Sequence, residues 1–440
     1  MTMLKNIPLR EVATFKYGKT IRKQDISTNG LYPVFSGYQI VGFDSKYAFE
    51  EPQLVIVCRG AGGTGDIKMS PEKCSITNLA IVINCDKEII DQDYLYWVLK
   101  LSDTYSLRTG SAQPQITIGS LENFRIEIIE DINTQKKISK ILSGLDNKIH
   151  LNNQINQTLE SIAQAIFKSW FIDFDPVRAK IAAKQEGKDA EFAAMCAISG
   201  KSEAEVEQMA KEDFAELQAT AALFPDELVE SELGDVPKGW SVQKIKDFGR
   251  VICGKTPSKS IAEYYGNDIP FIKIPDMHHD VFVLDSFEKL SEKGSNSQAN
   301  KILPKGSICV SCIATVGKVI ITHQPSQTNQ QINSIVPDLP IYTYFLYFLM
   351  GEKERLFHDL ASGGSATLNM NTSTFSNVDI LMPNSKIIEA YDGVVSRIFD
   401  EILHNLKLSF LLGDMRDALL PKLLSGELDV SGLDLELTHE

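Results

Sequence analysis

Apolar residues recur at alternating spacings of three and four along residues 138–166, and this pattern predicts one long helix. The positions are Ile138, Leu142, Leu145, Ile149, Asn152, Ile155, Leu159, Ile162 and Ile166. A period of 3.5 residues held over four heptads is typical of a helix that coils around a partner. Asn152 is the polar interruption on this stripe, a residue type that commonly fixes the register of such a pair. A second, less regular stripe occupies 388–419, so we expect the two helices to pair as an antiparallel coiled coil.

Short β-like runs precede each helix and are separated by glycine, proline and asparagine. They include LVIVC (54–58), AIVI (80–83), ICVSCIA (308–314) and KVIIT (318–322). Runs of this length, rich in valine and isoleucine and bounded by turn residues, predict strands. We therefore expect a mixed α/β (α+β) globular domain before each long helix.

The two halves of the chain match each other in the same order, at an offset that drifts from 236 to 254. The matches are Leu9-x-x-Val12 with Ile245-x-x-Phe248, Gly18-Lys19-Thr20 with Gly254-Lys255-Thr256, Thr77-Asn78 with Thr328-Asn329, YLYWVL (94–99) with FLYFLM (345–350), and Gly110-Ser111-Ala112 with Gly364-Ser365-Ala366. Each match is weak alone, but together they predict two copies of one unit.

The repeat and the helical stripes divide the chain into six segments. We expect an N-terminal globular domain at 1–130, a central spacer helix at 131–180, an Ala/Glu-rich helical region and linker at 181–235, a C-terminal globular domain at 236–385, a C-terminal spacer helix at 386–428 and an acidic tail at 429–440.

The formal net charge of −14 over 440 residues is unevenly distributed. Residues 181–235 carry 4 Lys and Arg against 14 Asp and Glu, and residues 386–440 carry 5 against 11. Both globular domains are close to neutral, so a local basic face remains open on each, and only charge within a Debye length acts on a phosphate. The seven scattered cysteines indicate free thiols in a reducing compartment. No apolar run is long enough for a membrane span or a signal core, so we expect a cytoplasmic protein without membrane contact.

Two motifs resemble sites of other protein classes. Gly249-x4-Gly254-Lys255-Thr256 fits the phosphate-loop pattern of nucleotide-binding enzymes, but Val251 and Ile252 stiffen the loop and Pro257 stands where a helix should begin. We favour a turn whose lysine and threonine face a phosphate. Cys309-x-x-Cys312 is half a zinc site, yet residues three apart on a strand point to opposite faces. The sequence therefore predicts two free thiols and neither catalytic nor metal-ligating residues.

Two similar domains on a helical spacer suit a ligand with two separated halves, and duplex DNA is such a ligand. Candidate phosphate contacts, which position a protein without reading sequence, are Lys16, Lys19, Thr20, Arg22, Lys23, Lys255, Thr256 and Lys259. Candidate base contacts, on two glycine-led loops rich in amide and hydroxyl groups, are Ser111, Gln113, Gln115, Ser365, Thr367 and Asn369. Further donors are Arg59, Arg108, Asn329 and Gln330. Two alternatives stay open: these are ordinary turn and surface residues, or the chain is a protein-only scaffold with two partner-binding domains.

The stretch IFKSWFIDFDPVRAK (166–180) gathers four aromatic residues at the end of the first helix. Phe167, Trp170, Phe171 and Phe174 spread beyond a stripe that pairs only two helices. We expect them to cover the junction between the helix and the linker, and also to form part of a partner-binding surface. Asp175 is expected to cap a new helix with Pro176 at its first position.

Five further features are distinctive when taken together: FKSWFIDFDPVRAK (167–180), LGDVPKGW (233–240), ICVSCIATVGK followed by TNQQI (308–332), the two GSA loops and LLPKLLSGELDV (419–430). With these features the chain resembles, over nearly its whole length, the specificity (S) subunit of type I restriction-modification enzymes.

The resemblance implies a non-catalytic subunit with two target-recognition domains, each reading one half of a split asymmetric DNA sequence, and helices that set the spacer. It also implies two methyltransferase (M) subunits, docked in part through the four aromatic residues, and restriction (R) subunits. S-adenosylmethionine, ATP and Mg are expected on those partner subunits, and this chain is expected to bind no cofactor itself.

Overall fold

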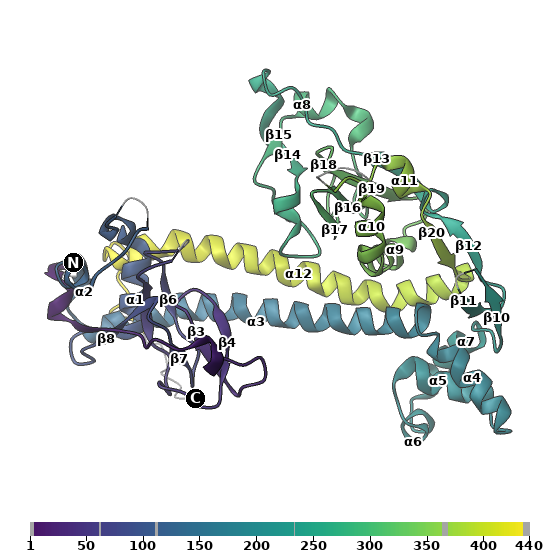
Figure 1. The fold of residues 1–440 in the computed structure, drawn as a ribbon, viewed down its shortest axis with the longest axis horizontal. Coiled ribbons are helices and arrows are strands. Elements are labelled where there is room, and N and C mark those ends of the chain that lie inside the picture. The colour runs from purple at the N-terminus through teal and green to yellow at the C-terminus, as the bar shows by residue number, and fades with distance from the viewer. Residues whose placement is uncertain (1–3, 61–62, 111–112, 233, 363–367, 434–440) are drawn as a thin grey trace. The chain divides into compact units, whose positions relative to one another are not determined.

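The computed structural model describes residues 4–60, 63–110, 113–232, 234–362 and 368–433 (Figure 1). The chain forms two compact units. The first unit combines the described residues up to Asn152 with those from Leu408 onward, and the second is Asn153–Lys407. Each unit contains one globular domain and a segment of both long helices, so the two units are described separately. The described helices include none whose length and apolar character would suit a membrane crossing.

The first unit is built on a four-stranded sheet of order β2-β8-β5-β6, a three-stranded sheet of order β4-β3-β7 and the pair β1-β9. Its strands are β1 (Leu4–Pro8), β2 (Ala13–Tyr17), β3 (Tyr32–Phe35), β4 (Ile40–Asp44), β5 (Leu54–Val57), β6 (Ile67–Met69), β7 (Ser75–Ile76), β8 (Ala80–Cys85) and β9 (Arg125–Ile129). Its short helices are η1 (Leu9–Glu11), η2 (Lys23–Asp25), α1 (Gln92–Leu101), η3 (Thr104–Leu107) and α2 (Ile118–Glu122).

Strand β5 shows why the run LVIVC predicts a central strand. All four of its side chains are buried, with Leu54 and Ile56 packing in the main core and Val55 in a smaller core on the opposite face of the sheet. A strand covered on both faces reads as a continuous apolar run, not an alternating one.

The second unit repeats this plan. Its strands are β10 (Leu228–Ser231), β11 (Gly234–Pro237), β12 (Ser241–Lys244), β13 (Gly249–Cys253), β14 (Tyr265–Ile272), β15 (Lys289–Leu290), β16 (Ile308–Ile313), β17 (Thr315–Ile321), β18 (Gln327–Thr328), β19 (Ile332–Pro337) and β20 (Asp379–Met382). Its helices after the linker are η4 (Ile245–Asp247), η5 (Ala262–Tyr264), η6 (Ile274–Met277), α8 (Glu292–Asn296), η7 (Ala299–Lys301), α9 (Tyr342–Glu352), α10 (Glu354–Ala361) and α11 (Thr372–Ser376).

The sheet orders confirm the predicted duplication. The orders β13-β19-β16-β17, β15-β14-β18 and β12-β20 in the second unit correspond strand by strand to the three sheets of the first. In the three-stranded sheet of each unit, the two-residue pairing of β3 with β7, or of β14 with β18, is parallel. The register corrects one match by a residue, because Ile76 pairs with Phe35 as Thr328 pairs with Ile272. Thr77 is therefore equivalent to Asn329, not to Thr328.

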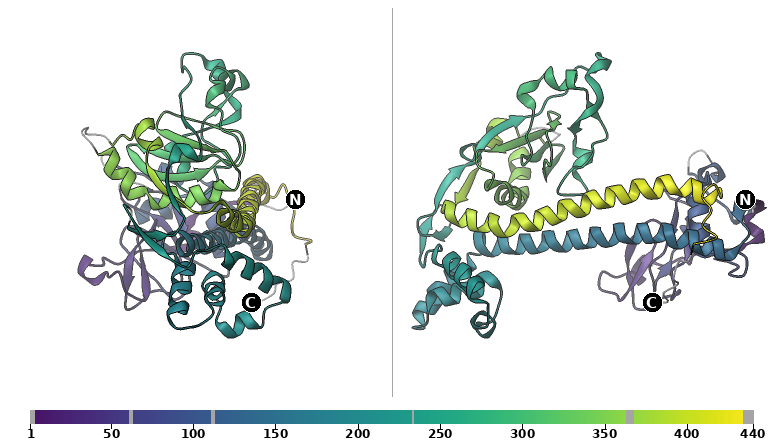
Figure 2. Two further views of the ribbon diagram at one scale, coloured as in Figure 1. Left: turned by 90° about the vertical axis from the view of Figure 1, so that its right-hand side faces the viewer. Right: turned by 180° about the vertical axis from the view of Figure 1, so that it is seen from behind.

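The long helices α3 (Ile132–Phe171) and α12 (Ser385–Leu424) run antiparallel within each unit (Figures 1 and 2). In the first unit Asp146 forms an ion pair with Arg416, and Asn152 donates from Nδ2 to Ser409 Oγ at 3.2 Å. Residue numbers rise on one helix as they fall on the other, which confirms the predicted antiparallel coiled coil. Asn152 is fully buried on the seam, as its place on the stripe predicted.

Beyond Asn152 the seam departs from the predicted stripe. Ile155 and Ile162, predicted to face α12, are 36% and 47% exposed, whereas Asn156 and Ala163 are buried in the second unit. The strict 3.5-residue pattern was wrong here, because a straight α-helix drifts by about 20° per heptad from a 3.5 repeat. The seam therefore moves one residue along the chain.

The segment 131–180, predicted as the central spacer, contains the end of α3 at Phe171 and, as predicted, a new helix near Asp175. The second long helix ends at Leu424, before the predicted residue 428. Phe174 adopts a left-handed conformation with φ of 56°, which breaks the first helix and precedes α4 (Asp175–Gln185). Asp175 is thus the first residue of the new helix and not its cap, and Pro176 follows it. Helices α4, α5 (Ala190–Ser199), α6 (Glu203–Glu207) and α7 (Lys211–Ala222) fill the region between the repeats.

Candidate DNA interface

The Gly-Lys-Thr loop of the second repeat is a close backbone crossing, not a phosphate cradle. The N–H of Gly254 donates to Ile332 O at 3.0 Å, and the N–H of Lys255 donates to Thr328 O at 2.9 Å. A Cβ on Gly254 would lie 2.2 Å from Asn329 O, so only glycine fits. A phosphate loop needs free, converging N–H groups, and these two are already bonded. This geometry excludes the nucleotide-binding interpretation.

The equivalent loop of the first repeat borders a cavity of about 670 Å³. Exposed Lys16, Lys19 and Thr20 line it together with Lys46 and Tyr47. Within the part of the chain that the structure describes, the lysines at 16 and 19 form no ion pair. Three of the predicted phosphate contacts thus line one cavity, and the ammonium groups of its two lysines at 16 and 19 are free to contact a phosphate. Arg22 is also exposed, a few residues further along the same loop. Lys23 falls in η2, and its side chain lies outside the described part of the chain.

Arg108 is held on an aromatic support in the first repeat. Its guanidinium lies 4.2 Å from the centre of the Tyr105 ring, and its Nε donates to Thr64 O at 2.6 Å. The Tyr105 hydroxyl in turn donates to Asp66. The φ of Gly65 is +98°, and a Cβ there would meet the Tyr105 ring at 2.8 Å, so glycine allows this stacking. Because Nε is anchored, the two terminal nitrogens of Arg108 remain as an oriented donor pair.

Arg59 lies two residues beyond the end of β5 and pairs with the loop that begins at Gly110. Its backbone forms an isolated bridge with Gln115, which also bridges Thr109. The Arg59 guanidinium lies over the Tyr17 ring at 5.5 Å, and its buried Nε has no hydrogen-bond partner among the described residues. Residues far apart in the sequence therefore place arginine and glutamine side by side at the end of the central strand.

The second repeat has the same backbone arrangement with other side chains. Ile313 bridges Asn369 as Arg59 bridges Gln115. Asn369 is exposed and Ile313 is half-buried.

One further backbone bond confirms this equivalence. The N–H of Met370 donates to Cys312 O at 2.9 Å, and in the first repeat the N–H of Ile116 donates to Cys58 O at the same distance. The predicted equivalence of the two glycine-led loops is therefore correct at Gln115 and Asn369.

Three further candidates of the second repeat lie in its Gly-Lys-Thr loop or shortly after it. Lys255 and Lys259 are exposed, and Thr256 donates from Oγ1 to Gln330 Oε1 at 2.7 Å. Asn329, in contrast, is only 7% exposed, and both ends of its amide bond to Gln331 in the same turn. Its side chain is occupied in stabilising the turn, so Asn329 is not available for a base. Gln113 is exposed, whereas Ser111, Ser365 and Thr367 lie outside the described residues.

Comparison with known proteins identifies this arrangement. A model of the type I restriction modification DNA specificity domain matches residues 3–161 and again residues 237–408. The chain belongs to this family. The two matched ranges each contain one globular domain and most of the helix that follows it, which agrees with the repeat seen in the fold.

Two curated relatives and one solved structure support the assignment. The type I restriction enzyme HindI specificity subunit of Haemophilus influenzae is 47% identical over 368 residues, which are 79% of this chain and 80% of that protein. The MjaIX specificity subunit of Methanocaldococcus jannaschii is 34% identical over 185 residues, 41% of this chain and 42% of that protein. The crystal structure of a type I S subunit from M. genitalium covers 96% of both chains with a TM-score of 0.61 and 14% identity, a likeness in fold. This chain is a specificity subunit of a type I restriction-modification system.

In this specificity subunit, the four aromatic residues at and just after the end of α3 belong to the core of the second unit. Phe167, Trp170, Phe171 and Phe174 are 0, 2, 5 and 8% exposed. Phe167 stacks on Phe348 with ring centres 5.6 Å apart. The expected cover of the junction is therefore present, but these rings offer almost no surface to a partner.

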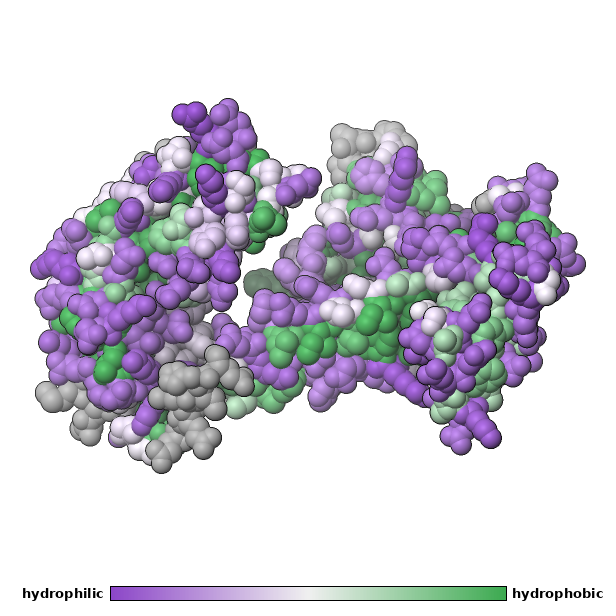
Figure 3. All heavy atoms as spheres, turned by 90° about the horizontal axis from the view of Figure 1, so that it is seen from below, coloured by the Kyte–Doolittle hydropathy of each residue, from purple (hydrophilic) through white to green (hydrophobic). Residues whose placement is uncertain are grey.

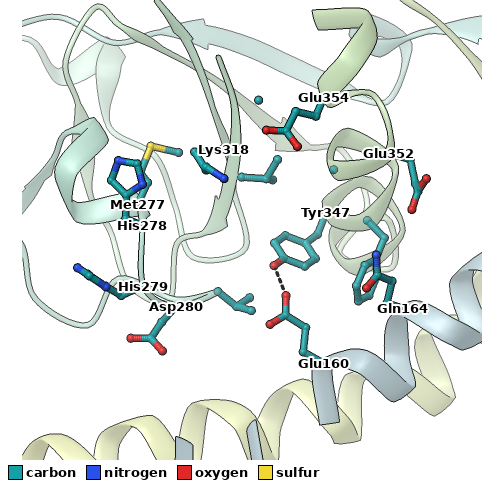
Figure 4. Close-up of a pocket in the computed structure, with 15 residues that line it drawn as sticks. Glu160, Gln164, Met277, His278, His279, Asp280, Lys318, Tyr347, Glu352 and Glu354 are labelled. Carbon is teal, nitrogen blue, oxygen red and sulfur yellow. Dashed lines mark hydrogen bonds between the residues drawn. The ribbon is translucent and has the colours of Figure 1, made fainter. Parts of the chain in front are cut away.

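The second unit also contains a polar cavity of about 480 Å³ between its globular domain and α3 (Figure 4). Tyr347 reaches across one side of it and donates to Glu160 Oε1 at 2.6 Å. Burial raises the pKa of the Asp280 carboxyl on the other side. His278, His279 and Asp280 are consecutive, yet the described residues contain no cluster of three side chains that suits a metal.

The Cys309-x-x-Cys312 motif is not half a metal site. Cys309 packs in a small core on one face of β16, whereas Cys312 packs in the main core on the other. Burial raises the pKa of Cys309 to about 12 and that of Cys312 to about 11. Both are thiols at neutral pH, so neither is a ready metal ligand.

Proposed function

We propose that this specificity subunit binds duplex DNA with both repeats, each reading one half of a split, asymmetric target. The paired helices set the spacing between the two halves and dock two methyltransferase subunits, and restriction subunits join for cleavage. The chain itself is non-catalytic. S-adenosylmethionine, ATP and Mg act on the partner subunits.

The observation that carries the proposal is one backbone framework presenting unlike side chains at equivalent places. The bridge that holds Arg59 to Gln115 in the first repeat holds Ile313 to Asn369 in the second. Base edges in the major groove are read by side chains of this kind, each with its own preference. Two DNA-binding repeats with the same backbone geometry but different side chains fit a target whose two halves differ in sequence.

Exposed cations near these loops support a DNA-bound orientation. Lys16 and Lys19 in the first repeat, and Lys255 and Lys259 in the second, are exposed in or beside their Gly-Lys-Thr loops, and Lys19 and Lys255 occupy equivalent positions. Contacts of lysine with phosphate supply affinity without sequence preference. The near-neutral charge of each repeat is compatible with this role, because phosphates respond to the local field.

Apolar side chains left exposed on the long helices support the docking of protein partners. In the second unit, Ile155 and Ile162 on α3 are 36% and 47% exposed and lie two turns apart on one face. In the first unit, Phe410 and Leu411 on α12 are 50% and 55% exposed. Figure 3 shows apolar surface over the long helices. Exposed apolar patches of this kind are typical of protein interfaces.

The test is DNA binding by the full-length chain assembled with its methyltransferase subunits, measured by gel shift at several salt concentrations. We expect specific binding whose affinity falls steeply with salt. Lys255→Ala should weaken binding to all duplexes alike and lower the salt slope by about one unit. Lys238→Ala is the matched control. Lys238 is exposed, lies directly after β11 and outside the Gly-Lys-Thr loop, and its Nζ is 2.7 Å from Glu227 Oε2.

The alternative is a protein-only scaffold. A complex that assembles fully but shows no salt-sensitive DNA binding would favour the scaffold and refute the proposed function. Variants of the exposed helix face separate the docking role from DNA reading. Ile155→Asp with Ile162→Asp should prevent assembly with methyltransferase subunits, whereas Lys255→Ala should leave assembly unchanged.

A further inference from the structure

One residue at the end of the central strand of each repeat occupies a defined place in the framework. Arg59 lies two residues beyond β5 and Ile313 is the last residue of β16, and each pairs with the loop residue that precedes a buried apolar side chain. The backbone turns at the next residue in both repeats, with φ of 139° at Gly60 and 65° at Ala314. The two side chains therefore leave the sheet from equivalent positions.

In the first repeat this place carries arginine with additional hydrogen-bond donors around it. Arg59 stacks on Tyr17 and keeps its Nε without a protein partner. Arg108 is fixed by Thr64 O, and Gln115, the bridge partner of Arg59, is exposed. An arginine fork donates two parallel hydrogen bonds to O6 and N7 of guanine, the commonest specific contact in the major groove. Prior fixation by an aromatic ring lowers the entropy lost on binding.

In the second repeat the same place is apolar. Ile313 is half-buried and cannot donate a hydrogen bond, and its bridge partner Asn369 presents an exposed amide. An asparagine amide pairs with N6 and N7 of adenine, and an apolar side chain contacts the methyl group of thymine. A guanine opposite Ile313 would leave its acceptors unpaired, which disfavours a G·C pair there.

We propose that the two half-sites differ in base composition at equivalent positions: Arg59 reads the guanine of a G·C pair in the first half-site, with Arg108 beside it, and Ile313 with Asn369 reads an A·T pair in the second. This assignment rests on the proposed function, since it presupposes that both repeats read DNA.

The experiment is methylome sequencing of cells that express the full-length chain with its methyltransferase subunits. The wild-type complex should methylate a split motif with a G·C pair in one half. Arg59→Ala should broaden that single position, with discrimination falling roughly 5- to 150-fold, the loss expected for one bidentate base contact. Arg59→Lys keeps the charge but lacks the fork, so we expect partial broadening at the same position. Asn369→Ala should broaden an A·T position in the other half only.

Controls and contrary outcomes separate this assignment from the proposed function. Arg125→Ala is the matched arginine control, because its side chain bonds to Asn6 in the separate β1-β9 sheet, and its motif should be unchanged. Circular dichroism and co-purification with methyltransferase show that each variant is folded. The assignment is overturned if Arg59→Ala and Arg59→Lys broaden an A·T position, or lower methylation at every site with an unchanged motif. Failure of the wild-type complex to methylate any specific motif would refute the proposed function itself.

Discussion

Asn156 and Asn405 form a buried amide pair on the helix seam of the second unit, and we predict that the pair is energetically coupled. Asn405 donates from Nδ2 to Asn156 Oδ1 at 3.1 Å, and Asn156 donates from its own Nδ2 to Ile402 O at 3.2 Å. The two asparagines are 8% and 5% exposed. Water has almost no access to the atoms that would lose their partners.

The magnitude follows from which groups each change leaves unpaired. Asn156→Ala removes two hydrogen bonds and leaves the buried amide of Asn405 without an acceptor, so we expect a loss of about 2–4 kcal/mol in the free energy of unfolding. Asn405→Ala leaves Asn156 still bonded to the backbone, and a smaller loss of about 1–2 kcal/mol follows. Replacing both by leucine removes every unpaired group and keeps the number and branching of the side-chain heavy atoms, so the double variant should be close to wild type in stability.

The assay is urea unfolding at 25 °C followed by tryptophan fluorescence. Trp170 and Trp240 both lie in the core of the second unit, so their emission reports on the unit that contains the pair. Gln157→Ala, an exposed amide one residue further along α3, is the matched control and should change stability by less than about 0.5 kcal/mol. The predicted coupling is refuted if Asn156→Ala is as mild as the control, or if the double leucine variant loses as much stability as Asn156→Leu and Asn405→Leu, measured singly, lose together.

Three further variants test other parts of the second unit. Burial and a neighbouring carboxylate raise the pKa of Asp392 from 3.8 to about 6, so the folded state becomes less stable as pH rises from about 4 to 6. In thermal melts, Asp392→Asn should raise the melting temperature at pH 7.5 but not at pH 4. The control Glu389→Gln, at an exposed position, should leave the melting temperature unchanged at both pH values. Trp170→Ala should cost about 3–5 kcal/mol in urea unfolding but leave methyltransferase docking intact in the folded protein; loss of docking by a folded variant would contradict its core role. Gly254→Ala places a Cβ 2.2 Å from a backbone oxygen and should lower the melting temperature, whereas Gly351→Ala, with nothing within 4 Å, should not.

The repeated architecture was predictable because it depends on many weak signals that agree. Matches at Leu9 and Gly18 and at their counterparts Ile245 and Gly254 recur in one order, and each marks a buried or closely packed position that both copies need. Glycine is required at 254 because a backbone carbonyl oxygen lies where a Cβ would stand, not because a phosphate binds there. The pattern therefore showed where the framework is constrained, although one motif within it suggested a different chemistry.

The details that sequence missed depend on contacts between distant segments. The shift of the helix seam from Ile155 to Asn156 depends on the superhelical drift and on Asn405, which lies on the other helix. The burial of Asn329 depends on its bonds to Gln331 in a tight turn. No local signal separates a structural asparagine from one that faces DNA, because both are polar residues in a turn.

The backbone framework at the end of each central strand accommodates different side chains. The framework at the end of each central strand is held by backbone hydrogen bonds, such as those that join Met370 to Cys312 and Ile116 to Cys58. These bonds do not depend on the side chains at 59 or 313. If these side chains contact bases as proposed, their exchange would alter the base contacts and leave the backbone framework in place. The two repeats of this chain already differ in this way, with arginine at one position and isoleucine at its equivalent.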